Sequence, residues 1–213
     1  MLQNYFIAGT DCGVGKTYVT CALLRDLQAC GIDAIGYKPV ACGDRNEARD
    51  IREAVGKPTY SLDAINPVYL RTLAEPIIAA EMERKSIERD ALVQGFEQLA
   101  AAHQMVLVDG CGSWETPLAT GFSMADLAAA LNLPVILVVN NRPGAAGLVQ
   151  LTLQSIQSRG LKCCGYILNH IGEEWSTASV TNSRVISDLT HLPILAEFIH
   201  GQDYVDAKEV LSL

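Results

Sequence analysis

The sequence predicts a single α/β domain built on a mostly parallel sheet with helices on both faces. Apolar, β-rich runs alternate along the chain with helical patterns, and four of these runs lack the polar alternation of a half-exposed strand. That order favours right-handed crossovers between parallel strands. The 213 residues are enough for one buried core, so residues 1–213 are expected to form one domain. The predicted strands are residues 5–8, 34–37, 105–108, 135–139, 164–168 and 194–198.

Helices are predicted between these strands from apolar spacing and from residues typical of helix ends. The first is expected to end before Gly31, because glycine commonly follows the last turn of a helix. A later helix is expected to be capped by Ser123, with Asp126 three residues on. The next is expected to open at Pro143 and Gly144. Apolar residues spaced by three or four support these helices: Val19, Leu23 and Leu27; Leu92, Phe96 and Leu99; Leu127 and Leu131; Leu148 and Leu151.

The interval 41–76 is predicted to be an irregular insertion after the second strand, because turn-forming residues recur through its middle. Such insertions commonly carry function. In an open α/β sheet, ligands bind outside the carboxyl ends of the strands. Motifs at those ends are therefore the first candidates for a functional site.

The overall charge excludes some classes of partner. With 16 Lys and Arg against 24 Asp and Glu, the formal net charge is −8, which disfavours nonspecific binding to nucleic acid or to an anionic membrane. The longest apolar run, residues 134–139, is shorter than the ~18 residues of a spanning helix, and no leader pattern precedes the first strand. The seven cysteines lack metal-ligand spacing. We therefore expect a cytoplasmic protein with reduced thiols, for which a polyanionic partner is disfavoured and a nucleotide is not excluded.

A glycine-rich loop follows the first predicted strand and leads directly into a helix. Amides of Gly13, Gly15 and the helix start can wrap a β-phosphate. Lys16 can bridge the β- and γ-phosphates, and the Thr17 hydroxyl can ligate Mg²⁺. Thr10 stands where the strict motif has glycine, but the order of strand, loop and helix predicts a P-loop NTPase-like fold. The predicted nucleotide-binding loop comprises Asp11, Cys12, Gly13, Val14, Gly15, Lys16 and Thr17.

Two polar residues at strand ends complete the predicted nucleotide site. Asp109 ends an apolar strand, where a carboxylate beside a phosphate loop commonly holds Mg²⁺ directly or through water. Asn169 ends a later strand, and its side-chain amide can read the edge of adenine. Asp11 occupies the loop position at which dimeric partitioning ATPases carry a second lysine. This residue argues against a motor-like or regulatory ATPase.

Five segments, taken together, closely resemble dethiobiotin synthetase. They are GTDCGVGKT at residues 9–17, GYKPV at 36–40, AEP at 74–76, VDGCGSW at 108–114 and LPVILVV at 133–139. The phosphate loop alone is shared by many ATPases, whereas GYKPV together with VDGCGSW is much narrower. The matches follow in order from residue 4 to about residue 170, and more loosely to the C-terminus.

The resemblance implies a homodimeric ligase that uses ATP and Mg²⁺ to close a ureido ring on 7,8-diaminopelargonate with CO₂, giving dethiobiotin. One amine captures CO₂ as a carbamate, the carbamate takes the γ-phosphoryl group, and the second amine attacks the mixed anhydride. ADP and phosphate are released. Two anions must approach each other, so the steps need fixed positive charge. Ring closure needs little beyond proximity.

The resemblance also implies roles for individual residues in the phosphoryl chemistry. Lys16 and Lys38 are the implied catalytic residues. Lys16 contacts the phosphates, and Lys38 lies at the junction of the carbamate and the γ-phosphate. Thr17, Asp50 and Asp109 are implied to hold Mg²⁺ directly or through water.

The implied substrate site draws on other parts of the chain. Cys12 and Cys42 fall near the diamine, at positions where the family usually has hydroxyl residues, and Lys38 reaches the same place. Gly144 and Ala145, at a helix start, are implied to offer amides to the substrate carboxylate across the dimer, from the partner subunit.

Three departures from the family bear on these assignments. Asp109 replaces a common Glu and is one methylene shorter, so a water is expected between Asp109 and Mg²⁺. Pro76 is followed by Ile77 rather than by a Ser-Pro-His type of segment, and Gly147 with Leu148 replaces an Asn-His pair. Two alternatives therefore stay open: a related ATP-dependent ligase for another small amine or carboxylate, or a non-catalytic, nucleotide-gated binding module.

Overall fold

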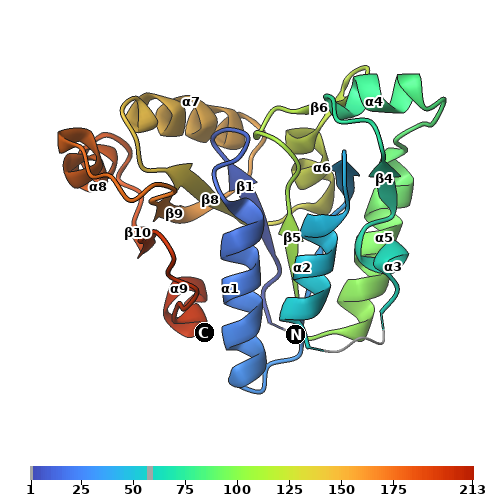
Figure 1. Cartoon of the computed structure of the whole chain (residues 1–213), viewed down its shortest axis with the longest axis horizontal. Coiled ribbons are helices and arrows are strands. Elements are labelled where there is room, and N and C mark those ends of the chain that lie inside the picture. The colour runs from blue at the N-terminus through green and yellow to red at the C-terminus, as the bar shows by residue number, and fades with distance from the viewer. Residues whose placement is uncertain (1, 57–59) are drawn as a thin grey trace.

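A six-stranded parallel sheet forms the centre of the structure, a computed structural model that describes residues 2–56 and 60–213 (Figure 1). Its strands are β1 (Tyr5–Gly9), β2 (Ala34–Tyr37), β5 (Met105–Asp109), β8 (Val135–Asn140), β9 (Cys163–Asn169) and β10 (Ile194–Phe198). Their spatial order is β10-β9-β8-β1-β5-β2, and every neighbouring pair is parallel. All the predicted strands are confirmed, with ends that differ by at most one residue.

Helices cover both faces of this sheet, as predicted. α1 (Lys16–Ala29) connects β1 to β2 in one direction along the sheet, and the later crossovers run in the opposite direction. Because the crossovers are right-handed, α1 and the helices of the later crossovers lie on opposite faces of the sheet. α1 packs against α2 (Asn46–Ala54) and α9 (Ala207–Leu211) (Figure 1). α5 (Arg89–Ala102) packs against α6 (Met124–Leu131), and α7 (Ala145–Ser158) against α8 (Thr177–Thr190). Within the described residues, no helix has the length and apolar character needed to cross a membrane.

The interval predicted to be irregular contains regular elements, so that expectation is wrong for most of it. Besides α2, it holds α3 (Leu62–Ile65) and the parallel pair of β3 (Val40–Cys42) and β4 (Val68–Leu70). These elements are too short for a repeating apolar pattern to reveal them. Residues 57–59 of this interval lie outside the described residues. Two further short elements follow: α4 (Pro76–Met82) and the antiparallel hairpin of β6 (Pro117–Ala119) and β7 (Phe122–Ser123).

Helix α7 begins after Gly144 as predicted, but the apolar pair that predicted it does not form its core face. Val149, Leu153 and Ile156 are buried, whereas Leu151 is exposed. The central strands are covered on both faces, with residues such as Phe6 fully buried. This burial explains why their sequences read as continuous apolar runs.

The predicted N-cap at Ser123 and the predicted glycine after the first helix are both confirmed. The Ser123 hydroxyl accepts a hydrogen bond from the Asp126 amide (3.2 Å), and the Asp126 carboxylate accepts one from the Ser123 amide (2.8 Å). This reciprocal pair is a capping box for α6. After α1, Gly31 has φ +74°, and its amide donates to Gln28 O (3.0 Å).

We expect Ser123→Ala to lower the free energy of unfolding by about 1 kcal/mol, because it removes one half of the capping box. Urea denaturation followed by circular dichroism measures the change. Ser158→Ala is the matched control, since this exposed hydroxyl donates to the Ser155 carbonyl near the end of α7, and surface changes usually stay within about 0.5 kcal/mol. Equal losses in the two variants would contradict the capping role.

Candidate active site

The phosphate loop joins β1 to α1 with a backbone geometry that favours glycine at two positions. Gly13 and Gly15 have φ values of 67° and 91°. A Cβ on Gly15 would lie 2.1 Å from Asn169 Nδ2. Gly15 is also the N-cap residue of α1. It has no side chain to accept hydrogen bonds from the first-turn amides, so these amides are available to an anion.

Lys38 is buried at the centre of a cluster of charges directly beside this loop, in which Asp109 is also buried and Glu47 is partly exposed. Its Nζ lies 3.0 Å from Asp109 Oδ2, 2.8 Å from Glu47 Oε2 and 3.2 Å from Gly110 O. The Thr17 hydroxyl donates to the same Asp109 oxygen at 2.5 Å. The structure therefore brings together Thr17, Lys38 and Asp109, three of the residues singled out in the sequence.

Each charged group of this cluster changes the pKa of its neighbours. Burial alone would lower the pKa of Lys38, but the carboxylates of Asp109 and Glu47 raise it above its usual value, so Lys38 stays an ammonium. Burial raises the pKa of Asp109, and Lys38 opposes that shift. Burial, and then the charge of Lys38, lower the pKa of Lys16. A polyphosphate would relieve the repulsion between the two lysines, because its charge is negative.

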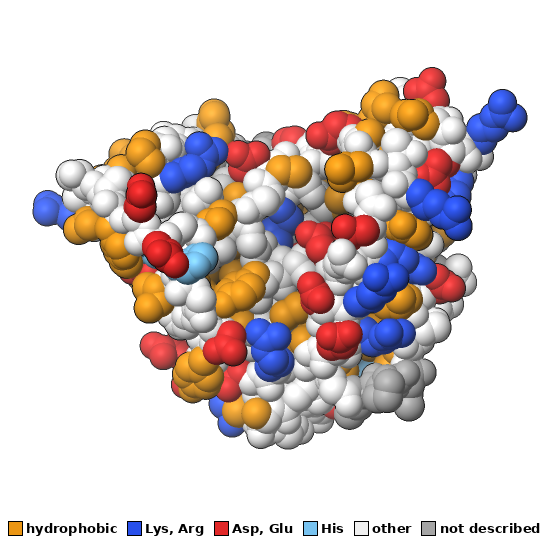
Figure 2. Space-filling view, in the orientation of Figure 1, with side chains coloured by type: hydrophobic (Ala, Val, Ile, Leu, Met, Phe, Trp, Pro, Cys, Tyr) orange, Lys and Arg blue, Asp and Glu red, His pale blue; other side chains and the backbone are white. Residues whose placement is uncertain are grey.

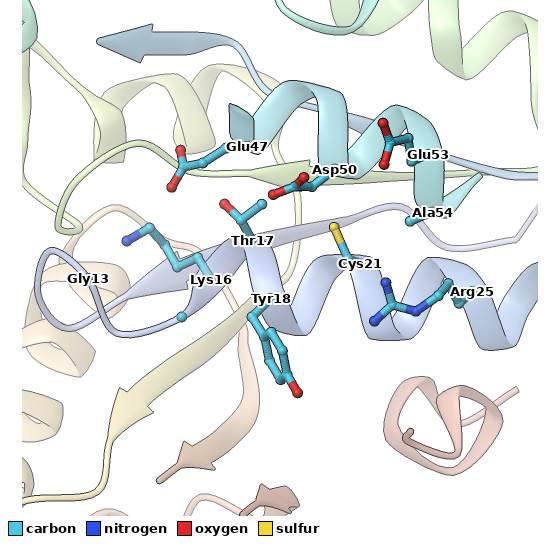
Figure 3. Close-up of a pocket in the computed structure, with 11 residues that line it drawn as sticks. Gly13, Lys16, Thr17, Tyr18, Cys21, Arg25, Glu47, Asp50, Glu53 and Ala54 are labelled. Atoms are coloured by element: carbon cyan, nitrogen blue, oxygen red, sulfur yellow. The ribbon is translucent and has the colours of Figure 1, made fainter. Parts of the chain in front are cut away.

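Glu47 lines this cleft and was not among the residues singled out in the sequence. It lies in the first turn of α2, and Figure 3 shows its carboxylate directed towards the Lys16 and Thr17 side of the cleft. Burial raises its pKa, but the charge of Lys38 and the hydrogen bond to it, with smaller contributions from Lys16 and Thr17, together lower the pKa below its usual value, so the group stays ionised. The only sequence signal was an acidic residue at a helix start, which is common on solvent-exposed helices.

The oxygen atoms around Thr17 suit a hard divalent cation. Asp109 Oδ1 is buried and, in the described part of the chain, accepts no hydrogen bond. It lies on the same carboxylate that accepts from Thr17, and Glu47 adds a second ionised carboxylate. Such hydroxyl and carboxylate oxygens are the ligands that Mg²⁺ prefers.

Asp50, one helical turn beyond Glu47, lines the same cleft. Its carboxylate also faces the cleft in Figure 3. Within residues 2–56 and 60–213, however, it makes no hydrogen bond or ion pair with Thr17, Lys38 or Asp109. Acidic side chains gather over α2 beside a hollow in this face of the molecule (Figure 2). The cleft has a volume of about 540 Å³.

Two cysteines, Cys12 and Cys111, interact with the charges of the lysines, and a third, Cys42, interacts with Cys111. Cys12 is exposed in the phosphate loop, and Cys42, at the end of β3, is partly buried. The interaction between the neighbouring thiols of Cys42 and Cys111 raises the pKa of Cys42 and lowers that of Cys111. The structure thus adds Cys111 to the two thiols predicted near the substrate.

Asn169 lies between the phosphate loop and a second cavity. Its Nδ2 donates to Val14 O at 2.9 Å, so it supports the loop directly. It also lines an adjoining, mostly apolar cavity of about 320 Å³. Gly13, Gly15 and Tyr18 line both cavities, which therefore meet at the phosphate loop.

The start of α7 is tied to the phosphate loop through an ion pair. Arg142 Nη2 lies 3.0 Å from Asp11 Oδ2. Asp11 also accepts from the Cys12 amide (2.7 Å), so it stabilises the loop internally. Gly144 is the exposed N-cap of α7 with φ +87°, and Ala145 is the first residue of the helix. Neither residue forms part of the cluster around Lys38.

Relatives of known name match nearly the whole chain. An ATP-dependent dethiobiotin synthetase, BioD, from Akkermansia muciniphila is 44% identical over 211 residues, which is 99% of this chain and 99% of that protein. The BioD protein of Anaeromyxobacter dehalogenans (strain 2CP-C) is 38% identical over 92% of this chain and 89% of its own length. The chain belongs to the dethiobiotin synthetase family. A broader family, described as an AAA domain, matches residues 3–206.

Solved structures at lower identity share the fold of this synthetase family member. MinD from Pyrococcus horikoshii OT3, complexed with Mg-ADP, gives a TM-score of 0.66 at 16% identity, over 100% of this chain and 95% of that one. Cobyrinic acid a,c-diamide synthase from Mycobacterium smegmatis, with bound ADP and magnesium, gives 0.60 at 16% identity, over 100% and 92%. The predicted P-loop NTPase-like fold is confirmed.

We expect Glu47→Gln to raise the Mg²⁺ concentration required for half-maximal ADP binding and turnover by at least about tenfold, as loss of a carboxylate near a metal commonly does. Asp50→Asn is the matched control on the same helix and should shift that concentration less than about twofold. Mg²⁺ titrations of both variants measure the effect. A larger shift in Asp50→Asn than in Glu47→Gln would favour the ligand set expected from the sequence.

Proposed function

We propose that this protein is an ATP-dependent ligase that closes the ureido ring of dethiobiotin from 7,8-diaminopelargonate and CO₂. Membership of the dethiobiotin synthetase family supports this reaction class. The observation that carries the proposal is the Lys38 ammonium, buried beside Asp109 and the phosphate loop. It supplies fixed positive charge where a phosphoryl group and a second anion would meet.

In this proposal, the triphosphate binds along the start of α1. The free amides of the first turn hold the β-phosphate, and Lys16 contacts the β- and γ-phosphates. Thr17, Asp109 and Glu47 would hold Mg²⁺, which neutralises phosphate charge when bound. Glu47 replaces Asp50 as the preferred second carboxylate, because Glu47 forms the ion pair with Lys38. A water between Mg²⁺ and Asp109 fits the shorter side chain of aspartate.

Lys38 would orient the carbamate oxygen towards the γ-phosphorus. Both reacting groups are anions, and an ammonium between them lowers their repulsion. The carbamate oxygen takes the phosphoryl group, and ADP leaves. The second amine of the same molecule then attacks the carbonyl carbon and phosphate leaves, a step that depends chiefly on proximity.

The diamine would lie against the partly buried thiol of Cys42, with Cys12 at the loop. One wall of this pocket is formed differently from the family pattern, because α4 starts at Pro76 and continues with apolar residues. A homodimer would complete the site, with the amides at Gly144 and Ala145 binding the substrate carboxylate across the interface. The protein would act in the cytoplasm, with ATP as co-substrate.

The test is ADP release by the purified protein with Mg²⁺-ATP and bicarbonate, with and without 7,8-diaminopelargonate, followed by mass detection of the product. We expect diamine-dependent turnover and a new cyclic urea. Turnover with another small amine or carboxylate, but not with the diamine, would instead favour a related ligase. Nucleotide binding with no turnover on any substrate would favour a nucleotide-gated binding module.

We expect Lys16→Ala to reduce turnover at least about 100-fold, because it removes a charge that stabilises the transferring phosphoryl group. Cys42→Ser should keep or raise the activity, because a hydroxyl is the stronger hydrogen-bond partner. Initial rates of ADP release measure both effects, with circular dichroism as the check on folding. Loss of activity in a folded Cys42→Ser protein would contradict the view that Cys42 stands in for a hydroxyl residue.

A further inference from the structure

Tyr18 stands at the junction of the two cavities that meet at the phosphate loop. It follows Thr17 directly, and Figure 3 shows its ring projecting from α1 away from Glu47 and Asp50. Gly13, Gly15 and Tyr18 line both the cleft beside Thr17 and the smaller, mostly apolar cavity. A nucleotide with its phosphates on the loop would therefore pass Tyr18 on the way to its base.

One wall of the smaller cavity is a loop with few anchors of its own. Residues 199–204 lie between β10 and α9, outside any helix or strand, and Ile199, His200 and Gly201 line the cavity. Within the loop, the Gln202 amide donates to Ile199 O at 3.0 Å. The Gln202 side chain adds a bond to Tyr204 O at 2.8 Å. These contacts shape the turn but do not fix it to the rest of the molecule.

Tyr18 provides that attachment on one side. Its hydroxyl donates a hydrogen bond to Gln202 O. Its ring packs edge-on against Phe198, with ring centroids 6.1 Å apart and planes at 75°. Phe198 is the last residue of β10 and is fully buried. Tyr18 therefore contacts both the residue that precedes the loop and a backbone carbonyl within the loop.

A second attachment reaches the loop from the opposite wall. His200 Nδ1 lies 2.6 Å from Ile171 O, and Ile171 follows β9 and lines the same cavity. The smaller cavity is thus bounded by the loop that follows β9 and the loop at 199–204, and the His200 contact joins these two loops. The loop at 199–204 is also tied through Tyr18 to α1, the helix that begins at the phosphate loop.

We propose that Tyr18 is a positioning residue that holds the 199–204 loop against α1 and thereby sets the affinity and preference for the nucleobase. This inference rests on the proposed use of a nucleotide. Backbone groups at the cavity wall can read a base edge only if the wall is fixed before the ligand arrives, because ordering it on binding costs affinity. The phosphate subsite does not need this attachment, since its amides belong to α1 itself.

The test separates base from phosphate by comparing two ligands in the presence of Mg²⁺. Isothermal titration of ADP reports both subsites, whereas inorganic tripolyphosphate reports only the phosphate subsite. Tyr18→Phe removes a single oxygen and should weaken ADP binding about fivefold to tenfold, the effect of one lost hydrogen bond. It should leave tripolyphosphate binding within about twofold and reduce the preference for ADP over CDP.

Tyr204→Phe is the matched control, because this tyrosine lies in the same loop and its side chain is largely exposed. It should change neither affinity. Unchanged ADP binding in Tyr18→Phe, or equal weakening of ADP and tripolyphosphate, would overturn the positioning role. So would an equal effect in Tyr204→Phe. Wild-type protein that binds no ADP would instead refute the proposed function, whereas ADP binding without ring closure would leave the role of Tyr18 intact.

Discussion

The burial of the Lys38 ammonium is the constraint on which the site depends. Burying this ammonium without a partner would cost several kcal/mol of folding free energy, so other elements of the fold must place carboxylates beside it. The register of the sheet provides the first, because Tyr37, the last residue of β2, pairs with Val108, and the next residues along the chain are Lys38 and Asp109. β1 pairs Ile7 with Asp109 and leads into the phosphate loop. Three parallel strands therefore fix lysine, carboxylate and loop together.

The insertion after β2 belongs to this arrangement and provides the second carboxylate. The Lys38 amide donates to Ile65 O (2.8 Å), and Asn66 Nδ2 donates back to Lys38 O (2.8 Å). Arg45, at the start of α2, holds the Asn66 side chain at 3.0 Å. The backbone that bears Lys38 and the helix that bears Glu47 are thus joined through a buried asparagine. Buried polar contacts of this kind favour one arrangement of the chain, because any alternative leaves groups unpaired.

The central sheet and the phosphate loop could be predicted because their signals are local. A strand covered on both faces needs an unbroken apolar run, and an anion-binding helix start needs glycine at fixed spacing. Asp109 was found for the same reason, since it ends an apolar strand, whereas Lys38 was found through the resemblance of its segment to dethiobiotin synthetase. Ser123 revealed its helix through a capping box that spans only four residues.

Glu47, Cys111 and Tyr18 could not be found in this way because their roles come from tertiary packing. Glu47 and Asp50 are both acids on one short helix, and only the placement of α2 against α1 separates them. Cys111 gains its partner from β3, far away in the sequence. Tyr18 reads as an ordinary helix residue until the loop that follows β10 closes on it. Short elements such as β3 and α3 were missed because three or four residues show no period.

The contact between Gly15 and Asn169 links two positions that are distant along the chain. The asparagine amide fills the space that any side chain at position 15 would need, and the same amide supports the loop through Val14 O. Mutational drift at one position is therefore constrained by the other. The backbone at position 15, with φ +91°, disfavours any other residue by itself, so loss of the asparagine alone would not open this position to a larger side chain, whereas a larger residue at position 15 would also displace the asparagine amide that supports the loop.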